Sequence, residues 1–143
     1  MTKITFVNGT TPALNATNLN QMQTNVENAI NELKPVVLYN NTSGTTGTAT
    51  LSETAANFQY LEIFYSKGGI YNSVKVYSPN NKKASLIIGY LNSSADAQLQ
   101  LAKVTISGTQ ITRDTSGYIN FGTTTHSMGT GTEVAIYRVL GYR

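Results

Sequence analysis

The chain contains no cysteine and no tryptophan, and its 143 residues include one histidine. Without cysteine, no disulfide, thiolate nucleophile or cysteine-ligated zinc site can form. The fold must therefore be held by a hydrophobic core or by association with other chains. Charged residues make up only 12% of the sequence, which is about half of their usual share. Uncharged side chains must therefore supply most of the polar surface.

Long hydrophobic runs are also missing. No segment approaches the roughly 20 apolar residues of a membrane helix, and residues 1–9 lack the apolar core and cleavage site of a signal peptide. We therefore expect a protein that is made in a cytoplasm and not inserted in a membrane. If it acts outside the cell, it leaves by lysis rather than by secretion. The 10 basic residues outnumber the 7 acidic ones but are scattered. Nucleic-acid binding, which needs cations aligned on one face, is not expected.

The abundant residue types are those of strands and tight turns. The sequence contains 21 Thr, 15 Asn and nine Tyr, a bias that suits short strands more than a helical bundle. Its length allows one compact domain and a short appendage. We place the division near Pro35, with an N-terminal segment over residues 1–34 and a β-domain over residues 35–143.

A helix is predicted within residues 15–34, because apolar residues recur there at spacings of three and four. Asn15 or Thr17 can cap its start, and Pro35 disfavours helical geometry at Lys34. Such a short, Asn-rich helix is marginal alone in water, so it needs a packing partner. The stripe consists of Leu19, Met22, Val26, Ala29, Ile30 and Leu33.

Two interpretations of this helix remain open on the pattern alone. The helix can lie on its own β-domain, as most amphipathic helices do. Alternatively, Leu19, Met22, Val26, Ala29 and Leu33 are the a and d positions of a short parallel coiled coil. In the second interpretation the stripe joins copies of the chain.

The rest of the chain reads as about nine strands separated by Gly, Asn, Ser and Asp turns. Many short strands at this spacing indicate an antiparallel sandwich or jelly-roll-like head rather than a parallel α/β sheet. Apolar stretches at 86–88 and 136–140 suggest outer faces that meet another subunit. The strands are expected at 36–40, 48–52, 60–66, 70–77, 84–91, 97–107, 110–113, 118–121 and 133–142.

Alternating apolar residues within these strands predict the core. In 97–107, for example, Leu99 and Leu101 are expected to point inward and Gln100 outward. The full predicted core is Leu61, Ile63, Val74, Val76, Leu86, Ile88, Leu99, Leu101, Val104, Ile106, Val134, Ile136 and Val139.

Groups capable of catalysis are few. His126 lies in a loop-like stretch and could join Asp96 or Asp114 in a triad, but no nucleophile elbow accompanies it. The carboxylates of the β-region are widely spaced, so they are better explained as solvated charges than as a pair that hydrolyses a glycosidic bond. Residues 114–117 are better explained as an Asx-type turn. We therefore expect no enzyme, no metal site and no cofactor. These carboxylates are Glu53, Glu62, Asp96, Asp114 and Glu133.

Recognition is the function that this composition favours. Tyrosine offers a flat apolar face and a hydroxyl at low entropic cost, so it suits binding of sugar rings, although it is also a common strand residue. Tyr71, Tyr77 and Tyr118 lie next to predicted turns and are the best candidates for a groove or rim. Asn72, Asp114 and His126 are their candidate polar partners.

Three stretches resemble bacteriophage tail and fibre proteins from phages of Gram-positive hosts. Residues 6–22, Phe-Val-Asn-Gly-Thr-Thr-Pro-Ala-Leu-Asn-Ala-Thr-Asn-Leu-Asn-Gln-Met, resemble the segment that leads into a short helix in those proteins. Residues 38–40, 48–53 and 57–65 resemble the start of their distal β-domains. The final Ile136-Tyr-Arg-Val-Leu-Gly-Tyr-Arg143 resembles their common C-terminus.

This resemblance implies a trimeric virion appendage and favours the coiled-coil interpretation of the helix. We therefore expect a non-enzymatic homotrimer on a virion whose β-domain binds host-wall carbohydrate. The alternative is a structural decoration protein of the capsid or tail that binds only other virion subunits. A small cell-wall hydrolase is a third possibility.

Overall fold

The computed structural model describes residues 16–91, 96–122, 126–131 and 134–143. The chain divides into two compact units, Met1–Pro35 and Val36–Arg143, one residue from the boundary expected from the sequence. Residues 6–15 of the phage-like segment, including the capping candidate Asn15, lie outside the described residues, as do residues 92–95 and Glu133.

The described part of the first unit is the helix α1, Ala16–Glu32. The amides of Leu33 and Lys34 bond to carbonyls three residues earlier, so Leu33 lies in a turn just beyond the helix. Gln21 and Gln23 donate to Asn25 and Glu27 one turn ahead, which supports the polar face. No residue of α1 is buried. Neither helix of the described chain is long and apolar enough to span a membrane.

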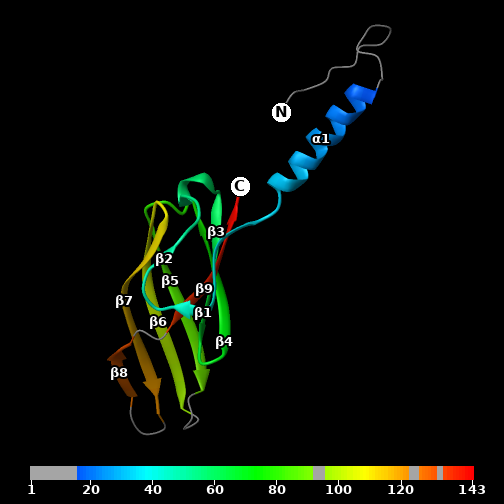
Figure 1. Cartoon of the computed structure of the whole chain (residues 1–143). Coiled ribbons are helices and arrows are strands. Elements are labelled where there is room, and N and C mark those ends of the chain that lie inside the picture. Colours follow the sequence, from blue (N-terminus) through cyan, green and yellow to red (C-terminus); the bar gives the residue numbers. More distant parts are fainter. Residues whose placement is uncertain (1–15, 92–95, 123–125, 132–133) are drawn as a thin grey trace. The chain divides into compact units, whose positions relative to one another are not determined.

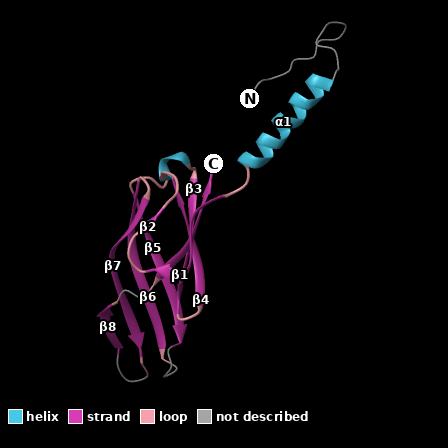
Figure 2. Ribbon diagram, in the orientation of Figure 1, coloured by secondary structure: helices cyan, strands magenta, loops and turns pink. Residues whose placement is uncertain are grey.

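The second unit contains nine strands and one 3-10 helix, η1 (Ala55–Asn57), within the described residues. Sheet A has the strand order β1-β9-β3-β4, and sheet B has the order β2-β7-β6-β5. In sheet B, β2 pairs with the start of β7 and β8 pairs with its end. All strand pairs are antiparallel. Figure 1 and Figure 2 show the two sheets as layers whose strands are aligned along a common axis. The strands are β1 (Val36–Thr45), β2 (Ala49–Thr50), β3 (Tyr60–Lys67), β4 (Ile70–Tyr77), β5 (Lys82–Leu91), β6 (Ala97–Ser107), β7 (Gln110–Phe121), β8 (His126–Thr130) and β9 (Ala135–Tyr142).

The register defines two ends of the β-domain. Val36 pairs with Gly141, so the chain enters and leaves at one end, which we call the base. The turn between β6 and β7 also lies at the base, since the amide of Leu51 and that of Ala55 bond to carbonyls of that turn. The opposite end, which we call the apex, contains the β3–β4 turn and the start of β6. Gly68 and Gly69 in that turn have positive φ angles that glycine adopts without strain.

Both sheets contribute to one hydrophobic core. All of the predicted core residues are buried except Val74, Leu99 and Leu101, whose side chains are partly exposed. Leu38, Leu51, Phe58, Tyr65 and Ile111 belong to the core but were not predicted. The buried core comprises Leu38, Ala49, Leu51, Ala55, Phe58, Leu61, Ile63, Tyr65, Val76, Ala84, Leu86, Ile88, Ala102, Val104, Ile106, Ile111, Val134, Ile136 and Val139.

Two strand predictions were wrong. The segments expected at 110–113 and 118–121 form one continuous strand, β7, and the predicted Asx turn at 114–117 lies inside it. Lys103 pairs with Thr115 and Val104 with Arg113, so Asp114 is the extra residue of a β-bulge. The bulge shifts the alternation of β7 by one residue. The predicted loop around His126 is the strand β8, paired to the end of β7.

The inward prediction for Leu99 and Leu101 was also wrong. Gln100 is buried, and the two leucines are on the outer face of sheet B. The pairing of β5 with β6 runs without a shift from Lys82–Ile106 to Leu91–Ala97. The apolar residues of β6 therefore change from the inner to the outer face between Ala102 and Leu101.

The mainly β class with one N-terminal helix and antiparallel sheets is confirmed. The jelly-roll-like arrangement and the coiled coil remain predictions.

Candidate functional site

The outer face of sheet A has aromatic side chains at both of its ends. Leu61, Ile63 and Tyr65 of β3 are buried, so the alternate residues of that strand point away from the core. Their neighbours on β4 and β9 extend this surface across three strands. We call it the aromatic face, and its aromatic residues are Tyr60, Phe64, Tyr71, Tyr77, Tyr137 and Tyr142.

The cluster near the apex surrounds a shallow hollow. Tyr71 meets Tyr137 edge to face with ring centroids 5.3 Å apart, and Phe64 lies 6.2 Å from Tyr137. Together with Asn72 and Ser73 these residues line a hollow of about 280 Å³. Tyr71 is 66% exposed. The ring of Tyr71 is therefore accessible beside a depression that also contains hydrogen-bonding groups.

The cluster near the base is more tightly packed. Tyr60 stacks on Tyr142 with ring centroids 4.3 Å apart, and Tyr77 lies 5.2 Å from Tyr60 at a tilt. The Nζ atom of Lys75 lies 5.3 Å from the centre of the Tyr60 ring. Tyr77 is 67% exposed, so it offers the accessible ring of this cluster.

Polar side chains connect the two clusters. The carboxylate of Glu62 accepts hydrogen bonds from Ser73 Oγ at 3.0 Å and from the Tyr142 hydroxyl at 3.2 Å. Burial raises the pKa of Tyr142, and the hydrogen bond to Glu62 adds to this effect. The tyrosine therefore stays a neutral donor. Arg138, which pairs with Phe64, is exposed on the same face.

Three of the predicted site residues are fixed by other contacts or lie on the other sheet. Asn72 donates from Nδ2 to the carbonyl of Ile87 at 3.2 Å and thereby ties β4 to β5. Tyr118 pairs with the buried Gln100 and faces inward. A Cβ at Gly129 would lie 2.6 Å from the Tyr118 ring, so this ring packs directly against β8. His126 is on sheet B, edge-on to Phe121 at 5.8 Å.

Asp114 also lies on sheet B, where it stabilises the bulge. Its carboxylate pairs with Lys83 Nζ at 2.8 Å and accepts from Thr105 Oγ1 at 2.8 and 2.9 Å. The hydrogen bond from Lys83, followed by that from Thr105, lowers the pKa of Asp114. Among the six predicted binding residues, Tyr71 and Tyr77 share the outer face of sheet A at opposite ends of β4, and Asn72 also lines the hollow beside Tyr71. Asp114 and His126 lie apart on the outer face of sheet B.

Replacement of Asp114 is expected to change the pH dependence of stability. Because the pKa of Asp114 is lower in the folded chain, its ion pair stabilises the fold above the unfolded value of 3.8 and loses this effect as the pH falls through the folded value. Asp114→Asn should therefore lower the melting temperature slightly at neutral pH, and the difference should shrink in acid and in high salt. An equal difference in acid and at neutral pH would show that the bulge geometry, not the charge, matters.

The register treats the two acid–histidine pairs considered from the sequence differently: Ala97, the residue after Asp96, pairs with Phe121, which is also the partner of His126, whereas Asp114 lies farther along β7. Asp114 lies within β7, and His126 of β8 pairs with Phe121 at the end of β7, seven residues or roughly 23 Å along the strand. Glu53 pairs with Arg143, and Glu62 is bonded to Ser73 and Tyr142. No group of three potential metal ligands comes together among the described residues.

Tyr60, Phe64, Tyr137 and Tyr142 were missed as site candidates. A signal for the first two was present, since residues 60, 62 and 64 alternate with the predicted core residues Leu61 and Ile63. Tyr137 was hidden by a shift in register, because β9 has a bulge between the partners of Phe64 and Tyr65. Comparison of the chain with known protein families, curated proteins and solved structures finds no match.

Proposed function

We propose that the chain is a non-enzymatic, homotrimeric virion appendage of a bacteriophage, with a sandwich-type β-head that binds carbohydrate on the host cell surface. The observation that carries the binding role is the exposed Tyr71 ring beside Tyr137, Phe64 and the hollow that they line. The virion setting rests on the resemblance of residues 6–22, 38–40, 48–53, 57–65 and 136–143 to phage tail and fibre proteins.

The chemistry of the aromatic face suits a sugar. The flat C–H faces of a sugar ring stack on exposed tyrosines, and its hydroxyls need donors and acceptors at the edge of the ring. Ser73 and the exposed Arg138 supply such groups between the two aromatic clusters. Tyr71 and Tyr77 are six residues apart on one strand, about 20 Å. An extended glycan of several sugar units fits this spacing better than a monosaccharide.

The homotrimer is supported by the exposed apolar stripe of α1. Leu19, Met22, Val26 and Ile30 are all more than two-fifths exposed in the chain. Leu19, Met22 and Val26, with Ala29 and Leu33, follow the alternating three- and four-residue spacing of a coiled-coil seam. Three heads held together would also allow weak sugar sites to act jointly on a repetitive surface.

Removal of the apex aromatics tests the carbohydrate site. Tyr71→Ala and Tyr137→Ala should each weaken adsorption to bacterial cells and to wall polysaccharides on a glycan array. Loss of one stacked ring costs about 1 to 3 kcal/mol, which is tenfold or more in affinity per site. Tyr77→Ala reports whether the base cluster joins the same glycan.

The matched control is Ile70→Ala, which removes an exposed apolar side chain next to Tyr71. It should leave adsorption unchanged. Unaltered circular dichroism shows that a variant is folded. The carbohydrate role is refuted if the intact chain adsorbs to no bacterial surface or polysaccharide, or if the tyrosine variants adsorb as well as the parent.

A structural decoration protein that binds only other virion subunits is the second candidate. The observation in its favour is an apolar outer surface on sheet B, which offers few polar groups for a sugar. Co-assembly with purified capsid or tail proteins, without adsorption to cells, is the result that favours this candidate.

A further inference from the structure

The apex half of sheet B has an apolar outer surface. The register aligns outward-pointing residues of four strands in cross-strand rows, such as Gly89, Leu99, Ile119 and Met128. We call this surface the sheet B patch. Its large side chains are Ile87, Leu91, Leu99, Leu101, Ile119, Phe121 and Met128.

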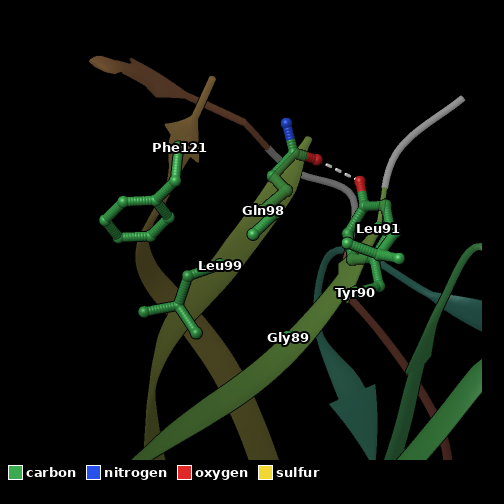
Figure 3. A pocket seen from close by; sticks show the side chains of 7 residues that line it. Gly89, Tyr90, Leu91, Gln98, Leu99 and Phe121 are labelled. Atoms are coloured by element: carbon green, nitrogen blue, oxygen red, sulfur yellow. Dashed lines mark hydrogen bonds between the residues drawn. The ribbon is translucent and has the colours of Figure 1, made fainter. Parts of the chain in front are cut away.

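Part of the sheet B patch is hollowed (Figure 3). Leu91, Leu99 and Phe121 contribute to the wall of a depression of about 430 Å³. The side chains of Leu99 and Phe121 point to one side of the sheet, whereas Gln98 reaches the other way and accepts a hydrogen bond from the Tyr90 hydroxyl. Tyr90 and Gln98 are therefore bonded to each other within the domain, whereas Leu99 and Phe121 face out.

The apolar residues of the sheet B patch lie on the outer face because of the sequence pattern of β6 and β7. In the base half of β6, Ala102, Val104 and Ile106 face the core; in the apex half Leu99 and Leu101 face out while Gln100 is buried. The bulge at Asp114 turns Ile119 outward as well, because it shifts the alternation along β7. A sheet face that only met water would have polar residues at these positions. The pattern therefore predicts that the patch is covered by a partner.

We propose that the sheet B patch is a contact surface between copies of this chain, so that the heads associate with one another in addition to the helices. The inference rests on the homo-oligomer of the proposed function and is independent of its sugar site. It assigns sheet A to the ligand and sheet B to assembly.

The absence of charge favours a second copy as the occupant. In the three rows of the patch the polar outward side chains are Thr130 and His126, both on β8. Lys103 and the Lys83–Asp114 pair lie in rows closer to the base. Around the three-fold axis of a trimer a charged patch would meet its own sign, whereas an uncharged apolar patch can pack there on its own copies. A glycan would find almost no hydrogen-bonding groups there.

The size of the patch supports the same occupant. Four strands and three rows of side chains span about 400 Å², whereas a stable interface takes about 800 Å² from each partner. The patch alone is therefore insufficient, and so is the short stripe of α1. Another copy of the chain presents both a sheet B patch and an α1 stripe, so association with a copy can bury the two surfaces together.

Single cysteines test the contact, because the chain has none of its own. Met128→Cys and Leu91→Cys place a thiol at positions that are 80% and 68% exposed in the single chain. The rate of alkylation by iodoacetamide is measured from nanomolar to high micromolar concentrations of the purified full-length chain. Ile70→Cys, at a residue that is 44% exposed outside the patch, is the control.

The proposal predicts that alkylation at positions 128 and 91 slows at least tenfold as the chain associates, while alkylation at position 70 does not. Since the solution contains only this chain, concentration-dependent protection identifies a second copy as the partner. The double variant Leu91→Glu, Met128→Glu should raise the dissociation constant from sedimentation at least tenfold. Ile70→Glu should not raise it.

Two results would overturn the proposal. One is a chain that associates with no change in alkylation at positions 128 and 91, which would assign assembly to the helix alone. The other is a chain that stays monomeric throughout the concentration range. Neither result affects the proposed sugar site, because that site lies on sheet A and is tested separately by the adsorption of the Tyr71→Ala and Tyr137→Ala variants.

Discussion

Val26→Asp in α1 is expected to convert the assembled chain into a monomer at micromolar concentration. Val26 lies at the centre of the apolar stripe, between Met22 and Ile30, and is 58% exposed in the single chain. An aspartate there is solvated in the monomer and costs the isolated chain little. In a parallel trimer three carboxylates would be forced together in an apolar seam, at a cost of several kcal/mol.

Sedimentation and thermal unfolding at several protein concentrations are the measurements. The variant should show a mass near one chain, and at concentrations where the parent associates it should have a lower melting temperature than the parent. Asn28→Asp is the matched control, since it adds the same charge two residues later on the opposite side of the helix. An unchanged assembly in Val26→Asp would mean that the stripe is not a subunit contact and that the heads alone hold the copies together.

The β3–β4 hairpin of sheet A was predicted closely, because local signals there agree with the tertiary structure. The strand expected at 70–77 has those bounds, and that expected at 60–66 extends by one residue. In β3 the buried Leu61, Ile63 and Tyr65 alternate with outward residues, and Gly68–Gly69 marks the turn. Alternation and turn chemistry identify such a hairpin without knowledge of its neighbours.

Sheet B was harder to predict, because its decisive features depend on distant residues. Asp114 resembles a turn residue, yet it is accommodated as a bulge because Lys83 and Thr105 hold its carboxylate. Leu99 and Leu101 have the pattern of a core strand, yet the core is already filled there by residues of the opposite phase, including Gln100. No alternation within β6 alone distinguishes its inner face from its outer face.

The candidate site was predicted only in part for the same reason. Exposed tyrosines next to turns were a sound criterion for Tyr71 and Tyr77. The criterion failed for Tyr118, because the chain continues through a bulge instead of a turn and the ring packs against Gly129. The partners of Tyr71 come from β3 and β9, and cross-strand neighbours of this kind follow from the register, which the sequence alone does not specify.

Phe58→Ala is expected to cause a large loss of stability in the β-domain. Phe58 is 5% exposed, lies beneath β9 at the base, and has the Arg143 guanidinium 4.9 Å from its ring centre. Truncation of a buried phenylalanine costs about 3 to 5 kcal/mol, a large part of the 5 to 15 kcal/mol of a typical domain. Urea unfolding at one fixed protein concentration measures the loss, because association also contributes to stability.

The close approach of Phe58 to Gly141 allows the cause of this loss to be tested. A Cβ at Gly141 would lie 2.5 Å from Phe58 Cδ1 and 2.8 Å from Leu38 Cδ1. Gly141→Ala should therefore cost about 1 to 3 kcal/mol by overfilling the core, whereas Gly47→Ala, where only Thr45 Oγ1 lies within 4 Å at 3.9 Å, should not. Phe58→Leu should relieve the crowding, so the double variant Phe58→Leu, Gly141→Ala should lose less stability than the two single changes together. Strictly additive losses would show that the Phe58 ring does not enforce glycine at this position, and the strain of Gly141→Ala would then have to come from Leu38.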